Sequence, residues 1–199
     1  MEKMEKSTNI GKLFVISACS GAGKTSVSRA LLKKYGNDFN LKKVITSTSR
    51  SPRSGELNGV DYNFLSVDEF KSHINQGFFL ETTEYAGNFY GSPASILKDL
   101  EQGKSYLMVT DRPGALVIKK LVPAAVLIWL LVPDFQTLCQ RLQNRGTDSP
   151  EVIARRLALA QEEMSQEQDE RSFDYHVQNN VFDITVEQVK NIIEQELQR

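Results

Sequence analysis

Cysteine is scarce in this chain, and its scarcity limits the classes of protein to which the chain can belong. Only two of the 199 residues are cysteines, Cys19 and Cys139, and they lie far apart in the sequence. Their separation fits neither a zinc motif nor a disulfide framework. Because disulfides are rare in the cytosol, we expect two reduced thiols in a cytoplasmic protein.

Long apolar runs are also missing. The longest, Val122–Val132, contains Pro123 and ends before Pro133. A membrane-spanning helix needs about 20 apolar residues, so this run predicts a strand buried on both faces instead. The segment Met1–Asn9 is polar and charged and lacks the apolar stretch of a signal peptide. We therefore expect no membrane partner.

Neither sign of charge is in excess. The sequence has 24 Lys and Arg against 25 Asp and Glu, a formal net charge of −1. Proteins that bind nucleic acid usually carry a basic excess, so we expect no nucleic-acid partner. Any site for phosphate must be built from local clusters of Arg and Lys.

The apolar pattern alternates between strands and helices. A β-rich segment, Lys12–Ser17, leads through a small turn, Ala18–Gly23, into a helical pattern over Lys24–Lys34. After residue 104 the alternation resumes with strands at 105–110, 125–132 and 175–178, helices near 114–121, 134–144 and 149–168, and a C-terminal helix capped by Thr185. Alternation of this kind predicts an α/β fold in which helices cover both faces of a parallel sheet.

The segment Thr46–Tyr90 breaks this rhythm. We expect strands at 43–48, 62–65 and 78–85, and a helix that runs from a capping box at Ser66–Glu69 to about residue 76. Ser92 and Pro93 then fit the N-cap and the first turn of a helix that ends near Gln102. Short strands around one helix predict a lobe inserted into the α/β core.

The turn after the first strand has the spacing of a phosphate-binding loop. Its residues are Ala18, Cys19, Ser20, Gly21, Ala22, Gly23, Lys24 and Thr25, followed by Ser26. Glycine permits the backbone angles and the close approach that such a loop requires, and the following helix directs its positive end at the phosphates. Lys24 is suited to neutralise the β and γ phosphates of ATP, and the Thr25 hydroxyl to ligate Mg²⁺.

Two residues of this loop raise separate questions. Ala18 stands where the motif has glycine, and we expect a small shift of the loop to accommodate its methyl group. Cys19 is either a thiol activated by the helix terminus or a small, tolerated side chain. We favour the second interpretation.

A second polar loop, Thr48–Glu56, carries Arg50 and Arg53 close enough to converge on one anion. Arginine is suited to bidentate contacts with phosphate. Taken alone, however, two arginines in a loop are more often solvated.

Several separated motifs together resemble the guanylate kinase family, from Gly11 to about Leu197. They are the phosphate loop, the loop at 49–56, Gly87–Ser92, Arg145–Asp148 and Ile153–Leu157. The resemblance implies a three-layer P-loop kinase fold with a central parallel sheet, an inserted GMP-binding lobe and a helical lid. It implies one domain over 1–199, with a core of about 10–45, 93–140 and 169–199, a lobe of about 46–92 and a lid of about 141–168.

The resemblance also implies roles for individual residues. Arg50, Arg53, Tyr62 and Tyr90 would hold the GMP phosphate, while Thr46, Glu81 and Ser92 would recognise guanine. A carboxylate suits guanine because N1–H and the exocyclic amine are paired donors, which adenine lacks. Without the resemblance, Glu81 would be read as a solvated strand residue, and Tyr62 and Tyr90 as core aromatics.

The lid would bring Arg141, Arg145 and Arg156 over the phosphates, and Asn179 would lie near adenine. Phosphoryl transfer depends mainly on positioning and on neutralisation of charge, and closure excludes water. The catalytic set would be Lys24, Arg50, Arg145 and Arg156. The alternative for this region is a surface helix whose arginines pair with Glu162 or Glu163.

The sequence departs from the family pattern at the end of one strand. The family ends this strand with two acidic residues separated by one, whereas this chain has Val109, Thr110 and Asp111. A carboxylate there helps to organise Mg²⁺ and its waters, so the loss predicts weaker metal positioning. Asp111 remains to contact guanine or a metal-bound water.

The predicted reaction is transfer of the ATP γ-phosphate to GMP, with dGMP as a further candidate acceptor, with Mg²⁺, by a monomer or homodimer. Because both departures, Ala18 and Val109, lie on the ATP side, an alternative is a catalytically weak binding module for GMP or a phosphopeptide. A related kinase for a sugar phosphate is a third possibility, which Glu81 and the complete Arg50–Tyr62 loop disfavour.

Overall fold

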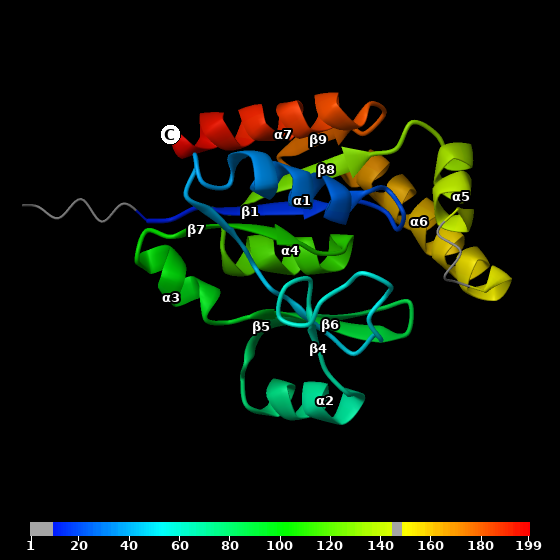
Figure 1. The fold of residues 1–199 in the computed structure, drawn as a ribbon, viewed down its shortest axis with the longest axis horizontal. Coiled ribbons are helices and arrows are strands. Elements are labelled where there is room, and N and C mark those ends of the chain that lie inside the picture. The colour runs from blue at the N-terminus through cyan, green and yellow to red at the C-terminus, as the bar shows by residue number, and fades with distance from the viewer. Residues whose placement is uncertain (1–9, 145–148) are drawn as a thin grey trace, which may run out of the picture.

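The central sheet is wholly parallel, as the alternation of strands and helices predicts (Figure 1). A computed structural model describes residues 10–144 and 149–199. In sheet order the strands are β2 (Leu41–Lys43), β7 (Ser105–Val109), β1 (Leu13–Ser17), β8 (Val126–Leu131) and β9 (Tyr175–Gln178). The run Val122–Val132, predicted to be a buried strand, contains β8, which is buried along nearly its whole length.

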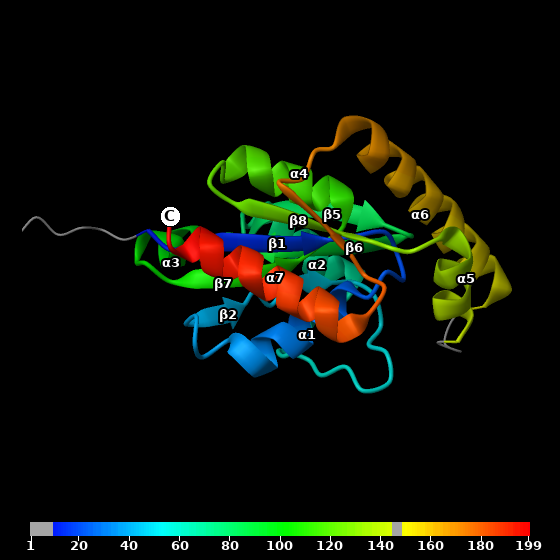
Figure 2. The ribbon, with the colours of Figure 1, turned by 90° about the horizontal axis from the view of Figure 1, so that it is seen from above.

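Helices cover both faces of this sheet, so the predicted three-layer arrangement is confirmed (Figure 2). On one face lie α1 (Lys24–Tyr35) and α7 (Phe182–Leu197); on the other lies α4 (Arg112–Leu121). Beyond the carboxyl ends of the strands lie α5 (Phe135–Gln143) and the long α6 (Pro150–Glu170). The short α3 (Ile96–Glu101) precedes β7.

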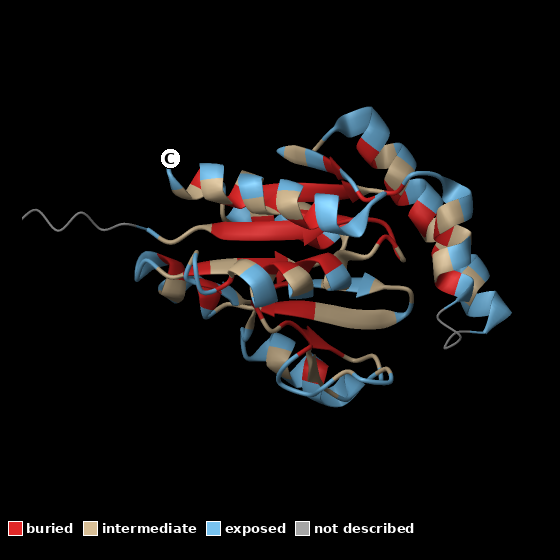
Figure 3. Cartoon of the chain, turned by 45° about the horizontal axis from the view of Figure 1, so that its top comes forward, coloured by how far each residue is buried: buried red, intermediate tan, exposed pale blue. Residues whose placement is uncertain are grey.

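The core is centred on β1, whose five residues are all buried (Figure 3). Phe14, Ile16 and Leu127 are completely shielded from solvent, and Trp129 packs against Phe173 with ring centroids 5.1 Å apart. Burial of each large apolar side chain contributes about 1.5–3 kcal/mol. The sheet is therefore a rigid support for the loops that leave its carboxyl edge, where α/β folds place their ligands.

The inserted lobe contains a second sheet of four strands. In sheet order these are β4 (Asn63–Phe64), β3 (Ser47–Thr48), β6 (Asn88–Pro93) and β5 (Phe79–Tyr85). The predicted capping box is present at the start of α2 (Val67–Asn75), where Ser66 and Glu69 exchange hydrogen bonds. Phe70 of α2 stacks on Phe79 and Phe89, with centroids 4.6 and 5.6 Å away, and so fixes α2 to the lobe sheet.

Three local predictions were wrong. The strand expected at 43–48 is two strands in different sheets, because the chain leaves β2 after Lys43 and enters the lobe at β3. Ser92 and Pro93 end β6 rather than start a helix, since Ser92 pairs with Glu81 of β5 across the sheet. The N-cap of α7 is Val181, and Thr185 lies inside the helix with its hydroxyl directed at the carbonyl groups of Gln178 and Val181.

Candidate active site

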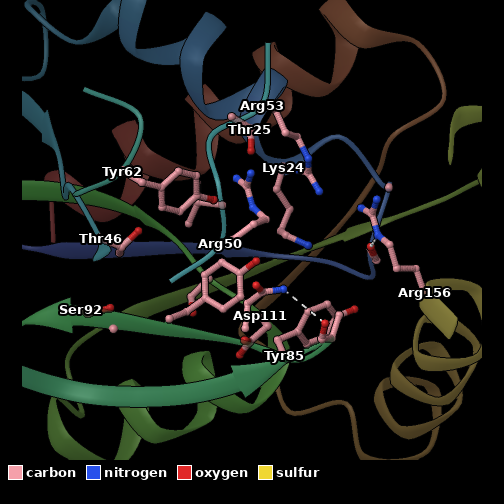
Figure 4. Close-up of a pocket in the computed structure, with 18 of the residues that line it drawn as sticks. Lys24, Thr25, Thr46, Arg50, Arg53, Tyr62, Tyr85, Ser92, Asp111 and Arg156 are labelled. Atoms are coloured by element: carbon pink, nitrogen blue, oxygen red, sulfur yellow. Dashed lines mark hydrogen bonds between the residues drawn. The ribbon is translucent and has the colours of Figure 1, made fainter. Parts of the chain in front are cut away.

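A cleft with a volume of about 280 Å³ lies between the carboxyl edge of the central sheet and the lobe sheet (Figure 4). Most of the residues singled out from the sequence line it: Ser20, Gly21, Gly23, Lys24, Thr25, Thr46, Arg50, Arg53, Tyr62, Glu81, Tyr90, Ser92, Asp111 and Arg156. Ala18, Cys19, Ala22, Ser26, Arg141 and Asn179 do not line the cleft. Arg145 lies outside the described residues.

The loop after β1 has the conformation that its glycines permit. Gly21 and Gly23 have φ angles of 89° and 97°, in the region that favours glycine. A Cβ atom on Gly23 would lie 2.9 Å from the side-chain nitrogen of Asn179. Nζ of Lys24 donates to the carbonyl oxygens of Ala18 at 2.6 Å and Cys19 at 3.2 Å. Because α1 begins at Lys24, its free N–H groups and the lysine form an anion site.

Ala18 and Cys19 face the protein interior. Ala18 is 0% exposed, so its methyl group packs in the core. Burial raises the pKa of the Cys19 thiol to about 11. A protonated, buried thiol is a poor nucleophile, which supports a packing role for Cys19.

A separate hollow lies on the other side of the phosphate loop. It is lined by Gly21, Gly23, Ser26, Arg141, Asn144, Asn179, Asn180 and Phe182. Arg141 donates to the carbonyl oxygen of Asn179 at 3.1 Å, and the Asn179 amide donates to that of Ala22 at 2.6 Å. Three predicted donor-site residues, Ser26, Arg141 and Asn179, therefore share one hollow beside the loop.

In the acceptor loop, Glu56 organises the two arginines. Both carboxylate oxygens of Glu56 accept from Nη2 of Arg50 at 3.0 Å, and one also accepts from the backbone N–H of Arg53 at 2.8 Å. The Arg50 guanidinium lies 5.6 Å from the centroid of the Tyr62 ring, close enough for a cation–π contact. Glu56 was present in the predicted loop but received no role.

Tyr62 and Tyr90 form the wall beside these arginines. Their ring centroids are 6.4 Å apart in an edge-on arrangement, and burial raises the pKa of Tyr62. The Tyr62 phenol therefore remains a protonated hydrogen-bond donor at neutral pH. The interpretation of these tyrosines as core aromatics does not hold, because both line the cleft.

Glu81 is buried at the floor of the cleft and is 7% exposed. One carboxylate oxygen accepts from Oγ of Ser92 at 2.6 Å, while the other is buried with no hydrogen-bond partner among the described residues. Burial raises the pKa of Glu81 to about 7, and the charge of Asp111 adds to the rise. A buried acceptor without a partner favours a ligand that offers N–H donors.

Asp111 lines the cleft but is already engaged with the protein. One oxygen caps α4 by accepting from the backbone N–H of Gly114 at 2.8 Å, and the other accepts from Thr83 at 2.7 Å. Val109 also lines the cleft, on the strand end where the family pattern has its other acid. No group of three or more potential metal ligands among His, Cys, Asp and Glu occurs in the described part of the chain.

Arg156 of α6 reaches the phosphate loop, where its Nε donates to Oγ of Ser20 at 2.9 Å.

Tyr85 and Glu163 were missed as site residues. Tyr85 lines the cleft and donates to Oε2 of the buried Glu163 at 3.0 Å. Glu163 therefore pairs with a tyrosine of the lobe rather than with a lid arginine. A periodic signal was present, since Arg156, Ala160, Glu163 and Glu167 follow the helical spacing of a buried face.

Comparisons with known proteins agree with this geometry. The family model described as guanylate kinase matches residues 10–196. A guanylate kinase of Lactobacillus johnsonii is 41% identical over 187 residues, covering 94% of this chain and 89% of that protein. One of Psychrobacter arcticus is 42% identical over 184 residues, covering 92% and 86%. The crystal structure of guanylate kinase from Anaplasma phagocytophilum superposes with a TM-score of 0.76 at 27% identity, covering 96% of this chain and 88% of that one.

Among the helices of residues 10–144 and 149–199, none combines the length and the apolar character required to cross a bilayer.

Proposed function

The chain belongs to the guanylate kinase family and is an ATP-dependent kinase of GMP, and we propose that the cleft of Figure 4 carries out this reaction. Two different anion sites meet in one cleft, and this observation carries the assignment of the donor and acceptor sites. Lys24 and the start of α1 line one side, and Arg50 and Arg53 line the other. Two phosphate sites that face one space suit transfer of a phosphoryl group between them.

On the donor side, the backbone N–H groups of the phosphate loop and Lys24 hold the ATP phosphates. Lys24 must exchange its bonds to the Ala18 and Cys19 carbonyls for phosphate oxygens when ATP binds. The hollow formed by Ser26, Arg141 and Asn179 holds the adenosine part of ATP.

On the acceptor side, Arg50, Arg53, Tyr62 and Tyr90 hold the GMP phosphate, and Thr46, Glu81 and Ser92 bind guanine. The unpartnered oxygen of Glu81 accepts from one donor of the guanine edge. Asp111 holds Thr83 and the start of α4 beside the base and accepts from guanine where its geometry permits.

Charge neutralisation during transfer comes from Lys24, Arg50 and Arg156, with Arg145 as the fourth member of the catalytic set. The dissociative character of phosphoryl transfer places charge on the equatorial oxygens, which fixed cations stabilise. In this scheme the segment of about 141–168, which contains the end of α5 and most of α6, acts as a lid over the core (about 10–45, 93–140 and 169–199) and the lobe (about 46–92).

The residues present fit Mg²⁺ held mainly by substrate. The Thr25 hydroxyl lines the cleft next to Lys24, and Mg²⁺ in kinases takes one or two protein ligands and completes its shell with phosphates and water. When bound, the ion neutralises charge between the β and γ phosphates. Asp111, the N-cap of α4, would hold the ion through a water molecule.

The binding-module alternative is disfavoured by the donor side of the cleft. A module that only binds GMP has no use for Lys24, Thr25 and Arg156, all of which line the same space as the acceptor site. We further propose a cytoplasmic enzyme, monomeric or homodimeric, that also accepts dGMP, because the contacts proposed for guanine do not involve the sugar.

The test is ADP formation from ATP and Mg²⁺ with GMP, dGMP, AMP, CMP or UMP as acceptor, with Lys24→Ala as the control variant. GMP-selective turnover that disappears in the control is the expected result. Binding of GMP without turnover in the unaltered protein would instead support the binding module.

A further inference from the structure

Tyr85 and Glu163 connect two parts of the molecule that the proposed reaction requires to act together. Tyr85 is the last residue of β5, the lobe strand that also carries Glu81. Glu163 lies on α6, two helical turns beyond Arg156 on the same buried face. Their hydrogen bond of 3.0 Å is a side-chain contact between the acceptor lobe and α6.

The environment of the Glu163 carboxylate indicates that the pair has a role besides packing. Glu163 is 6% exposed, and its Oε1 is buried without a hydrogen-bond partner among the described residues. A buried carboxylate oxygen without a hydrogen-bond donor lowers the stability of the folded protein, so the presence of Glu163 at this position calls for an explanation. Burial raises the pKa of Glu163, and the ammonium group of Lys24 is the first influence that opposes the rise.

The same helix also reaches the phosphate loop. Arg156 donates to Ser20 at 2.9 Å, so α6 contacts the donor site through Arg156 and the acceptor lobe through Glu163. Because a helix is stiff over two turns, a displacement of Glu163 displaces Arg156. Tyr85 lines the cleft together with Asn88 and Tyr90, on the side where the proposed acceptor nucleotide binds.

We propose that Tyr85 and Glu163 are positioning residues that couple the acceptor site to the donor site, so that GMP in the lobe strengthens the binding of ATP at Lys24 and Arg156. The pair touches neither reacting phosphate in this scheme. It acts through α6 and through the electrostatic interaction between Glu163 and Lys24. The inference rests on the proposed use of the cleft by both nucleotides.

Calorimetry on the full chain tests the coupling. The dissociation constant of the non-hydrolysable β,γ-imido analogue of ATP with Mg²⁺ is measured with and without saturating GMP, and that of GMP with and without the analogue. Linkage requires the two ratios to be equal, and couplings of about 5- to 150-fold are typical. We expect a ratio in this range for the unaltered protein and a ratio near one for Tyr85→Phe, which removes the hydrogen bond. Glu163→Gln keeps an acceptor for Tyr85 but loses the charge, so its ratio should fall between these two values.

Two matched variants serve as controls. Tyr106→Phe removes a similar phenol–carboxylate bond, to Asp99 at 2.8 Å, far from the cleft, and Glu162→Gln removes an exposed charge from the same helix. Both are expected to retain the coupling. The double variant Tyr85→Phe/Glu163→Gln should lose no more than Tyr85→Phe alone, because the hydrogen bond is already absent in that single variant.

The proposal is overturned if the unaltered protein shows a ratio of one, or if both single variants keep the full ratio. Thermal melts confirm that the variants are folded, and Glu163→Gln is the milder change because its amide oxygen still accepts from Tyr85. Failure of the proposed function has a different signature, namely absence of GMP-dependent ADP formation in the unaltered protein.

Discussion

Ser92 donates a hydrogen bond of 2.6 Å to one oxygen of Glu81, and the other oxygen of Glu81 has no partner within the described residues. The two side chains face each other across the β5–β6 pair, where Glu81 lies opposite Ser92. This arrangement fixes the carboxyl group and leaves its second oxygen available as an acceptor in the proposed guanine site. It also makes the charge of Glu81 sensitive to pH, because burial raises its pKa to about 7.

We expect kcat/KM for GMP to rise as the pH increases from about 6 to about 8. Guanine offers two N–H donors, so it binds the ionised form of Glu81, which predominates above the raised pKa. The free energy of unfolding changes with pH in the opposite direction. An acid whose pKa is raised by folding stabilises the folded state at pH values below the pKa that it has in the unfolded chain. That contribution is lost as the pH rises through about 7. Initial rates and thermal melts across this range measure both effects.

Glu81→Gln is the control for this prediction. Its amide retains an acceptor for Ser92 but presents N–H groups to guanine, so kcat/KM for GMP should fall by roughly 10- to 100-fold, equivalent to about 1.5–3 kcal/mol. Its remaining pH dependence should follow only the GMP phosphate, which titrates near about 6. An unaltered pH profile in the variant would show that another group controls GMP binding.

Glu56→Gln should weaken GMP binding through Arg50. Glu56 holds Nη2 of Arg50 with both oxygens and the Arg53 backbone with one of them. Loss of its charge releases the guanidinium, and a charged hydrogen bond is worth about 1.5–3 kcal/mol. We expect KM for GMP to rise roughly 10-fold or more while KM for ATP stays the same. Glu84→Gln, an exposed change on β5, is the matched control, and equal KM values in the two variants would contradict a role for Glu56.

Where a residue's role depends on local sequence, the sequence predicted it. The glycines of the phosphate loop, the capping box at Ser66 and the alternation that gives a parallel sheet are all local signals. The guanine and phosphate residues came from the resemblance, since nothing in a single strand distinguishes Glu81 from a solvated glutamate. The structure brings Glu81, Arg50 and Lys24 to one cleft, and their roles there remain predictions.

Roles that depend on contacts distant in sequence were not predictable. Glu163 and Tyr85 meet only after the lobe and α6 have packed on the core. Threonine is a residue type that favours helix caps, which is why Thr185 was predicted to cap α7. Its hydroxyl instead bonds to the carbonyl oxygen of Val181 and to the Asn179 side chain, so the tertiary environment overrides the local preference. The division of residues 43–48 between two sheets likewise depends on which neighbour each strand finds.

Arg112→Ala should destabilise the protein strongly. Arg112 is 4% exposed and donates to Glu167 at 3.1 Å and to Glu170 at 2.6 Å, tying the start of α4 to the end of α6. Removal of one partner from a buried ion pair typically costs about 3–5 kcal/mol, because the other charge remains buried. Urea unfolding measures this loss.

Arg199→Ala is the control, because it breaks an ion pair whose arginine side chain is 60% exposed. It should lower the stability by less than about 1 kcal/mol. Similar values for the two variants would contradict the proposed anchoring of α6.

Ala18→Gly tests whether the unusual first residue of the phosphate loop impairs ATP binding. The Ala18 methyl group is fully buried in the core, and the residue meets the donor site only through its backbone carbonyl, which accepts from Lys24. We therefore expect the dissociation constant of ATP to change by less than about threefold, because an unstrained alanine leaves no strain for glycine to relieve.

The same variant should be less stable by about 0.5–1 kcal/mol or more, because glycine increases the entropy of the unfolded chain and the buried methyl contacts are lost. Calorimetric titration with ATP and urea unfolding measure the two quantities separately. A hundredfold gain in ATP affinity would contradict the accommodation of the methyl group, and would mean that the loop at Ala18 is held away from its best phosphate-binding conformation.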